Sequence, residues 1–332
     1  MKLKTGKLPN DLLKNLILAN LPQTRREVVA GPAVGEDCCA VDPGAMHCVL
    51  TTDPVTAAMA NAGRIVVHIC CNDLAASRAI PLGILLVMLM PPGTDMERVK
   101  TFQSQVEEAS SLLSVSILGG HTEITDSVNR PVLVGTGIGL IQPGGMVRSS
   151  GVRPGDDLVM TRWAAMEGTY ILATDYKDKL AGILTKTQWE EANALGSQIS
   201  VVKEGLLAAA FGVHAMHDAT EGGILGAVWE LCEASATGVV VDREKIPVLS
   251  VTRELCFRFR LDPLKLISSG SMLIACQEGP ALVQELQKQG IKATVIGRFN
   301  DSGSKLLHDT GRFDKIDLPD RDELYKISSM SL

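Results

Sequence analysis

The sequence predicts an α+β protein with two domains. Its 332 residues are 45% hydrophobic and 21% charged, which is typical of a globular chain too long for one small core. Predicted strands and helices mix in both halves without the strict alternation of a Rossmann domain. A segment rich in Gly, Pro and Ser at residues 142–157 interrupts the pattern. We therefore expect domains at residues 1–150 and 151–332.

Hydrophobic spacing predicts the elements of the first domain in order. They are a short helix at 11–20, a strand at 47–52, an apolar helix at 62–79 closed by Pro81, a buried strand at 82–90, an amphipathic helix capped by Asp95, and strands at 115–118 and 132–141 around turn residues Gly119 and Gly120.

The second domain is expected to begin with a strand at 158–161. After it come helices to about residue 210, a helix from 221–223 to 234, strands near Val239, 272–276 and 293–296, and a helix at 280–289. The segment from Gly303 onward is polar and is expected to be peripheral.

The composition argues against several classes of protein. A net charge of −6 and the lack of a basic run argue against a nucleic-acid partner. The N-terminus MKLKTGKLPNDLL has no apolar core of a secretory signal, and the apolar stretch 80–90 is too short to span a membrane. The eight cysteines include no CxxC pair, so we expect reduced thiols and a cytoplasmic protein.

Acidic residues follow or interrupt apolar segments at four places. They are Glu36 with Asp37, Asp53, Asn72 with Asp73, and Glu123. A carboxylate buried alone costs several kcal/mol, and no matching Lys or Arg accompanies these sites. Oxygen ligands of this kind suit Mg²⁺ bridging to phosphates. The alternative is that each acid caps a helix or lies in a solvated loop.

A second polar segment, HDATEGG, opens a predicted helix. Asp218 or Thr220 can cap this helix, and its free N–H groups would attract an anion such as phosphate. An ordinary acidic cap is the alternative. The pair Gly222-Gly223 favours a functional role, because glycine in a first turn costs helix stability.

Several other motifs lack the spacing that their chemistry needs. Thr5-Gly6-Lys7-Leu8 lacks the upstream Gly and the following Ser or Thr of a P-loop. The glycines of 135–139 fall in a strand and indicate close packing. His214 and His217 have too few neighbouring ligands for zinc. Cys38-Cys39 and Cys70-Cys71 are expected at close-packed positions rather than as nucleophiles.

The ordered motifs GEDCCAVD, TTDP, NDLAASRAIP, GGHTEI, RPGDDLVMT, HDATEGGILGAVWEL and SSGSMLIA resemble those of the PurM-like superfamily of ATP-binding enzymes. The resemblance runs from about residue 31 to residue 299. The superfamily includes aminoimidazole ribonucleotide (AIR) synthetase, thiamine-monophosphate kinase, selenophosphate synthetase and the hydrogenase maturation dehydratase HypE. The chain is most similar to the AIR-synthase-related, HypE-like branch.

This resemblance implies a PurM-like fold: an N-terminal α/β domain that forms a barrel in a homodimer, and a C-terminal α+β domain. It also implies that ATP and Mg²⁺ are bound in the N-terminal domain. The implied metal ligands are Glu36, Asp37, Asp53 and Asp73; the implied nucleotide-site residues are Asn72, Gly119, Gly120 and Thr122; Asp218, Thr220, Gly222 and Gly223 line the phosphate and substrate side. The candidate catalytic residues are His121, Asp218 and Thr220.

The chain departs from its relatives in three places. Glu36 replaces the usual Asp, and His121 stands where HypE and the thiamine enzyme have Asp. The residues Ile327 to Leu332 include no counterpart of the terminal cysteine of HypE. Because Ser329 and Ser331 are far weaker nucleophiles than a thiolate, we expect no carbamoyl group to be accepted there.

We therefore expect ATP- and Mg²⁺-dependent phosphoryl transfer that activates a substrate, with an amide-type oxygen as one class of acceptor. A small-molecule kinase and a non-catalytic nucleotide-binding maturation factor are the alternatives. The acceptor is either a small molecule or a partner maturation protein, and the sequence does not identify it.

Overall fold

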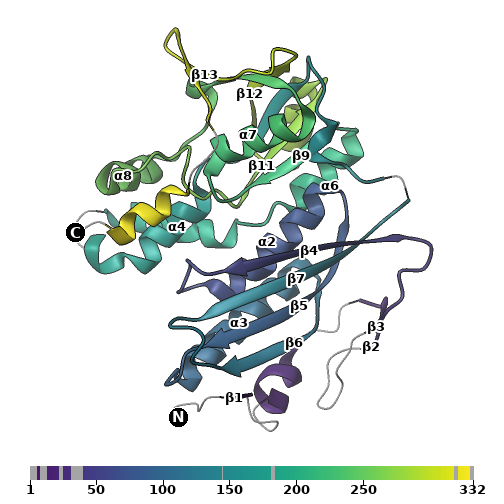
Figure 1. Ribbon diagram of the computed structural model, residues 1–332, viewed down its shortest axis with the longest axis vertical. Helices are drawn as coiled ribbons and strands as arrows, with labels where there is room; N and C mark the ends of the chain where they lie inside the picture. Colours follow the sequence, from purple (N-terminus) through teal and green to yellow (C-terminus); the bar gives the residue numbers. More distant parts are fainter. Residues whose placement is uncertain are drawn as a thin grey trace. The chain divides into compact units, whose positions relative to one another are not determined.

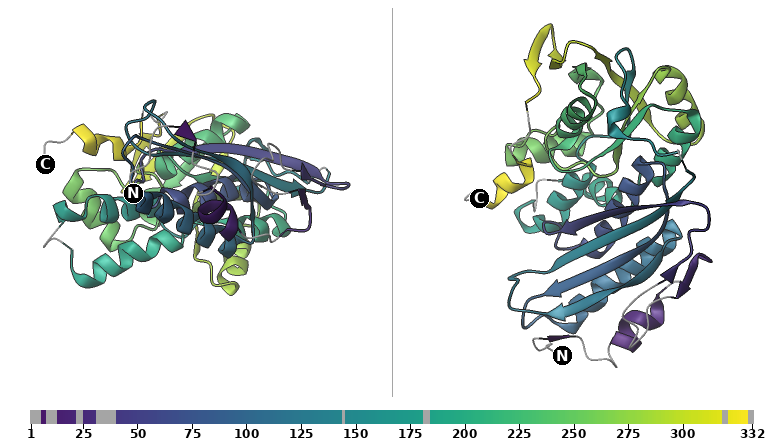
Figure 2. Two further views of the ribbon diagram at one scale, coloured as in Figure 1. Left: turned by 90° about the horizontal axis from the view of Figure 1, so that it is seen from below. Right: turned by 45° about the vertical axis from the view of Figure 1, so that its right-hand side comes forward.

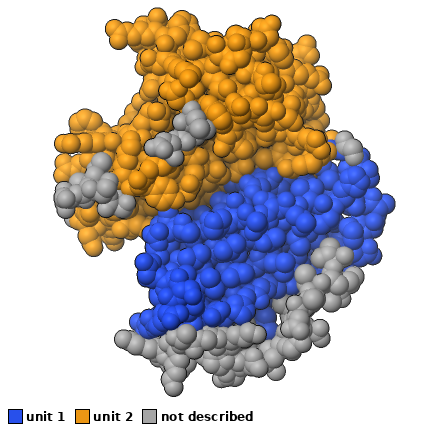
Figure 3. Space-filling view, viewed as in Figure 1, with its two compact units in different colours: residues 1–74, 79–145 blue, residues 75–78, 146–332 orange. Residues whose placement is uncertain are grey.

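The computed structural model describes residues 6–7, 13–21, 25–30, 40–143, 145–180, 184–317 and 321–329. The chain forms two compact units, which are coloured separately in Figure 3. Unit 1 comprises Met1–Leu74 and Ala79–Gly145, and unit 2 comprises Ala75–Arg78 and Met146–Leu332.

Unit 1 is built on a five-stranded sheet with the order β1-β6-β5-β7-β4. The strands are β1 (Gly6–Lys7), β4 (His47–Val55), β5 (Ile80–Met90), β6 (Ser116–Ile124) and β7 (Val132–Ile141). The pair β5–β6 is parallel, and the other pairs are antiparallel. A separate short pair joins β2 (Val28–Ala30) and β3 (Ala40–Val41).

Two helices, α2 (Ala62–Ala76) and α3 (Met96–Leu113), lie on one face of this sheet (Figures 1 and 2). The helix α3 makes the crossover that a parallel pair requires. Val99, Phe102 and Val106 of α3 are fully buried at helical spacing, as the sequence pattern predicts. The short helices η1 (Leu13–Ile17) and η2 (Leu18–Asn20) replace the regular helix expected at 11–20.

Two other expectations for unit 1 are wrong. Gly119 and Gly120 form no turn, because both lie inside the continuous strand β6. Pro81 does not close a helix but lies within β5, five residues after α2 has ended at Ala76. Asp95 is the N-cap residue of α3, as expected, although its side chain makes no capping hydrogen bond.

Unit 2 is built on a seven-stranded sheet with the order β14-β13-β10-β12-β8-β11-β9. The strands are β8 (Asp157–Thr161), β9 (Ala215–Ala219), β10 (Gly238–Asp242), β11 (Ser271–Cys276), β12 (Ala293–Asn300), β13 (Lys305–Asp309) and β14 (Arg312–Lys315). Its helices are α4 (Met166–Asp175), α5 (Lys186–Ala194), α6 (Val202–Phe211), α7 (Gly223–Ser235), α8 (Ser250–Phe259) and α9 (Gly279–Lys288). The remaining short helices are η3 (Ser149–Gly151), η4 (Lys177–Leu180), η5 (Leu195–Ser197), η6 (Arg243–Lys245) and η7 (Glu323–Ser329).

Both faces of the central strands are buried, which explains their continuous apolar sequence. In β11, Leu273 and Ala275 pack with α7 in one core, whereas Met272 and Ile274 pack with α6 and α9 in another. Successive residues of a strand point to opposite faces, so one strand serves two cores.

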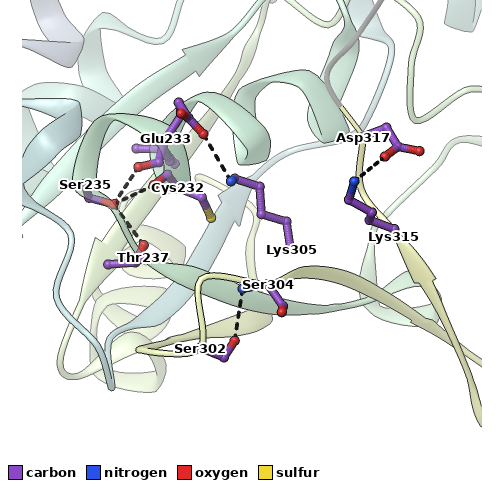
Figure 4. Close-up of polar contacts among 10 residues, drawn as sticks. Cys232, Glu233, Ser235, Thr237, Ser302, Ser304, Lys305, Lys315 and Asp317 are labelled. Carbon is purple, nitrogen blue, oxygen red and sulfur yellow. Dashed lines mark hydrogen bonds and ion pairs between the residues drawn. The ribbon is translucent and has the colours of Figure 1, made fainter.

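The C-terminal end of α7 is held by polar contacts with neighbouring segments (Figure 4). Lys305 on β13 lies 3.2 Å from the Glu233 carboxylate and over the ring of Trp229. The hydroxyls of Ser235 and Thr237 are 2.8 Å apart where the chain leaves the helix. These contacts join α7 to the sheet at its C-terminal end. The segment HDATEGG leads into the opposite end of the helix.

The expectation of a peripheral segment after Gly303 is also wrong. The strands β13 and β14 extend the sheet of unit 2, and Leu307 and Ile316 belong to the core around α7. Leu324 and Ile327 of η7 are also buried.

Candidate functional site

In unit 1, two of the predicted acids lie beside one threonine. Asp53 is near the end of β4, and Asp73 is in the last turn of α2. Thr51 Oγ1 lies 2.5 Å from Asp73 Oδ2 and 3.3 Å from Asp53 Oδ2. Both carboxylates are half-buried. The strand and the helix therefore bring two carboxylates from different segments to one point, where their oxygens remain within reach of solvent.

A row of glycines on β7 lets α2 approach the sheet closely enough for this contact. A Cβ atom on Gly135 would lie 2.6 Å from Cys70 Sγ, and one on Gly137 would lie 3.1 Å from both Cys70 Cβ and Thr51 Cγ2. Gly139 meets Leu74 in the same way. The glycines are thus packing residues, as the sequence indicated.

The buried residues beside Asp73 on α2 have a structural role. Burial raises the pKa of the Cys71 thiol to about 12, and the Asp73 charge acts in the same direction. Burial likewise raises the pKa of Cys70, and Asp53 adds to the effect. Both thiols therefore stay protonated, which supports the expectation that they are not nucleophiles. Asn72 is fully buried.

Gly120 lies in the same row of the sheet as Asp53. Asp53 pairs with Gly135, Gly135 with Leu86, and Leu86 with Gly120. Three strand spacings separate Asp53 from Gly120, or about 14 Å. A Cβ on Gly120 would lie 1.8 Å from the Leu86 carbonyl oxygen, so no other residue fits there. Thr122 is buried two residues further along β6.

His121 lies on the opposite face of the sheet from the two acids. It pairs with Val87, in the row beside that of Gly120, and side chains of adjacent rows point to opposite faces. Its Nε2 is 3.2 Å from Glu123 Oε2 on the same face. Within unit 1, the structure therefore brings Asp53 and Asp73 together and separates His121 from them.

Two other predicted metal ligands, Glu36 and Asp37, lie outside the described residues. Among the residues that are described, no group of three or more His, Cys, Asp and Glu side chains is close enough to hold a metal ion. The pair Asp53 and Asp73 nevertheless fits Mg²⁺, because this ion is usually held by one or two carboxylates, waters and substrate phosphates.

In unit 2, the predicted segment 218–223 connects β9 to α7. Asp218 is a buried residue of β9, and Thr220 follows it. The Thr220 carbonyl oxygen accepts hydrogen bonds from the N–H groups of Gly223, at 3.1 Å, and Ser268, at 3.2 Å. The segment is thus tied to the loop that precedes β11.

Both glycines of this segment have a structural reason to be glycine. Gly222 is the N-cap residue of α7 with a φ of 82°, and Gly223 has a φ of 64°. A Cβ on Gly223 would lie 2.6 Å from the Leu264 carbonyl oxygen. The close approach of the backbone at 264–266 therefore explains the glycine pair without a bound ligand.

The expected capping of α7 by Asp218 or Thr220 is wrong. The N-cap residue is Gly222, which has no side chain that could cap the helix. The Gly222 N–H instead donates to Asp322 Oδ2 at 2.8 Å, and the Leu225 N–H donates to the Leu264 carbonyl at 3.0 Å. These amides are satisfied within unit 2, so the helix end does not support the anion site inferred from free N–H groups.

An acidic cluster surrounds this segment. Burial raises the pKa of Glu167 on α4 to about 7, and the charges of Asp322, Glu221 and Asp218 act in the same direction, while a hydrogen bond with Ser269 opposes them. Burial also raises the pKa of Asp322 to about 6, against the hydrogen bonds that it accepts from backbone N–H groups. Glu167 is therefore protonated in part of the molecules near neutral pH, whereas Asp322 is mainly ionised there and takes up a proton only at mildly acidic pH.

Sequence reasoning assigned no role to Thr51, Glu167 or Asp322. For Thr51 a signal existed, because a residue two positions before Asp53 on a strand shares its face. Glu167 and Asp322 lie about 50 and 100 residues from the segment they surround, and no local pattern connects them to it.

The predicted site residues fall in both units. Asn72, Asp53, Asp73 and 119–122 belong to unit 1, and 218–223 belongs to unit 2. No helix in the described part of the chain is long and apolar enough to cross a membrane.

The amino-acid sequence matches a known protein family. The AIR synthase related protein family matches in two parts: its N-terminal domain at residues 35–141 and its C-terminal domain at residues 153–309. A putative hydrogenase expression/formation protein of Methanocaldococcus jannaschii is 26% identical over 284 residues, which cover 83% of this chain and 82% of that protein. The carbamoyl dehydratase HypE of Rhodobacter capsulatus is 28% identical over 268 residues, or 77% and 76% of the two chains.

Solved structures share the fold. The crystal structure of Escherichia coli HypE has a TM-score of 0.80 at 20% identity and covers 96% of this chain and 100% of its own. A structure of HypE in complex with ATP has a TM-score of 0.75 at 19% identity, with 92% and 93% covered. The fold is therefore PurM-like, with α/β N-terminal and C-terminal domains, as the sequence motifs predicted. The chain belongs to the AIR synthase related protein family.

Proposed function

We propose that the chain is an ATP- and Mg²⁺-dependent phosphoryl-transfer enzyme that activates a substrate, with an amide-type oxygen as the favoured acceptor. The observation that carries the proposal is the pairing of Asp53 and Asp73 through Thr51. The HypE relatives named carbamoyl dehydratase and the HypE structure with ATP support an ATP-dependent reaction of this class.

The proposed roles follow from the charges of the residues. Mg²⁺ bound beside Asp53 and Asp73 would neutralise phosphate charge, which is the main requirement of phosphoryl transfer. The strand β4 and the helix α2 carry the two carboxylates and would thereby set the position of the ion. Gly120, in the same row of the sheet, is proposed to lie along the nucleotide. Glu36 and Asp37 are proposed as further ligands. Asp218 and Thr220 are proposed to act on the acceptor side.

The test is calorimetry of ATP binding with and without Mg²⁺, together with phosphate release. We expect Asp53→Asn and Asp73→Asn to lose about ten-fold or more in Mg²⁺-dependent affinity while the fold is kept. Asp126→Asn is the matched control, because Asp126 is an exposed acid in the same unit. Unchanged affinity in both site variants rules out the site. Nucleotide binding without turnover for any acceptor favours the non-catalytic maturation factor.

We further propose a homodimer formed through the sheet of unit 1. The described helices α2 and α3 cover one face (Figure 1), while Leu50 on the edge strand β4 is 64% exposed on the other. Packing the same face of a second copy there would bury this surface symmetrically. Sedimentation should show a dimer at micromolar concentration, and Leu50→Lys should give a 35.4 kDa monomer. The control is Leu112→Lys, at a leucine on α3 that is 65% exposed. A monomeric wild-type protein contradicts the dimer.

The acceptor is proposed to be a small molecule or a partner maturation protein, in line with the hydrogenase-related names of the relatives. We propose that the protein is cytoplasmic. Free thiols at Cys48, Cys70, Cys71, Cys232, Cys256 and Cys276 fit a reducing compartment.

A further inference from the structure

The segment 321–329 packs against the segment 218–223 of the same unit. Asp322 is 2% exposed, and its Oδ2 accepts a hydrogen bond of 2.8 Å from the Gly222 N–H. Its Oδ1 accepts another of 2.8 Å from the Leu324 N–H, which fixes the carboxylate plane. One side chain thus joins two segments that are 100 residues apart.

Further contacts fix both sides of this connection. The Tyr325 hydroxyl donates a hydrogen bond of 2.7 Å to Glu221 Oε1. The Glu323 carboxylate accepts one of 3.1 Å from the Asp262 N–H, in the loop that also packs against Gly223. Buried Leu324 and Ile327 anchor the segment to the unit.

The backbone at 222–223 needs such a restraint. Two consecutive glycines with positive φ have more accessible conformations than any other pair of residues, and losing them costs entropy on folding. The group that accepts the hydrogen bond from the Gly222 N–H is the Asp322 carboxylate. It lies among the acids Glu167, Glu221 and Asp218, where its ionised form is disfavoured. The N–H of Gly222, the N-cap residue of α7, is therefore bonded to a carboxylate whose negative charge is disfavoured at that position.

We propose that Asp322 is a positioning residue that holds the segment 218–223 in the geometry needed for the reaction. This inference rests on the proposed function, in which Asp218 and Thr220 act on the acceptor side. In this proposal Asp322 acts through its hydrogen bond with the Gly222 N–H. The residues 321–329 then belong to the site as its fixed support.

The experiment compares Asp322→Ala, Asp322→Asn and Tyr325→Phe with Asp314→Ala, an exposed acid on β14 of the same unit. Hydrogen–deuterium exchange of the peptide covering 218–226 reports the restraint without any ligand. Calorimetry of Mg²⁺·ATP reports unit 1, and phosphate release from ATP reports turnover.

In Asp322→Ala we expect exchange at 222–224 to rise about ten-fold or more, because a buried amide loses its acceptor. Turnover should fall by a similar factor while Mg²⁺·ATP affinity stays unchanged. Asp322→Asn keeps an oxygen that can accept the Gly222 hydrogen bond. It should therefore retain most of the exchange protection at 222–224 and most of the turnover. If Asp322→Ala does not fold, Tyr325→Phe should show the same changes at smaller size.

Exchange equal to that of Asp314→Ala overturns the inference, as does faster exchange with unchanged turnover. A wild-type protein that does not bind Mg²⁺·ATP overturns the proposed function instead, and the exchange measurement distinguishes the two failures.

Discussion

Thr51 Oγ1 and Asp73 Oδ2 lie 2.5 Å apart, although one residue is on strand β4 and the other on helix α2. The same hydroxyl is 3.3 Å from Asp53 Oδ2. We expect Thr51→Val to lower Mg²⁺-dependent ATP affinity about ten-fold, because the carboxylates lose the group that orients them. Thr51→Ser should retain the affinity.

Thr52→Val is the control for this prediction. Thr52 is the neighbour of Thr51, and its hydroxyl bonds to the Gly135 carbonyl and to Thr136 rather than to an acid. Calorimetry of all three variants checks it, and equal losses in the two valine variants would show that the effect is general to β4.

Gly135→Ala should destabilise unit 1 by about 1–3 kcal/mol, because the new methyl group meets Cys70 Sγ at 2.6 Å and forces α2 from the sheet. The double variant with Cys70→Ala should recover part of this loss. Urea unfolding of the single and double variants gives the coupling energy. Additive effects would show that the glycine is not needed for contact with the helix.

The buried Glu167 should make unit 2 less stable as pH rises. Its folded pKa of about 7 exceeds the ordinary value of 4.5, so the folded state binds more protons between these values. The free energy of unfolding should therefore fall as pH rises from about 4.5 to 7, by at most about 3 kcal/mol.

Glu167→Gln should remove most of this fall and be more stable than wild type at pH 8. Asp322, with a pKa of about 6, leaves a smaller dependence of the same sign. Urea unfolding at pH 5 and pH 8 checks this, with Glu254→Gln, at an exposed acid of α8, as the control. An unaltered pH dependence in Glu167→Gln would refute the assignment.

Gly223→Ala should be far more disruptive than Gly155→Ala. Both glycines have positive φ, which costs an alanine about 1–2 kcal/mol, but only Gly223 has a carbonyl oxygen 2.6 Å from the added Cβ. Thermal unfolding of the two variants isolates the cost of that contact. Equal losses would mean that the loop at 264–266 yields to the methyl group.

The sequence was sufficient for features that depend on local periodicity. Apolar spacing predicted Asp73 on a helix and a strand that ends just before Asp53, and the structure extends this strand to Val55. The convergence of the two acids on Thr51 fits the cation site inferred from acids in apolar segments. The glycines of β7 were correctly interpreted as packing residues because they fall within a predicted strand.

Features that depend on tertiary structure could not be predicted. Gly119 and Gly120 carry the signal of a turn, yet they lie after an irregularity in the pairing of β5 with β6. The extra residue there reverses which side chains face the helices, so the face of His121 could not be counted from the start of the strand. Asp322 meets Gly222 only because η7 folds back onto unit 2.

The glycine row on β7 also bears on the size of ion that the proposed Mg²⁺ site would accept. The carboxylate of Asp73 is carried by α2, and the glycines set the height of that helix above β4. Oxygen ligands lie about 2.0–2.1 Å from Mg²⁺ and about 2.3–2.6 Å from Ca²⁺. A shift of a few tenths of an ångström in helix height equals the difference in ionic size. The absence of side chains at Gly135 and Gly137 would thus help to determine which ion radius the proposed site accommodates.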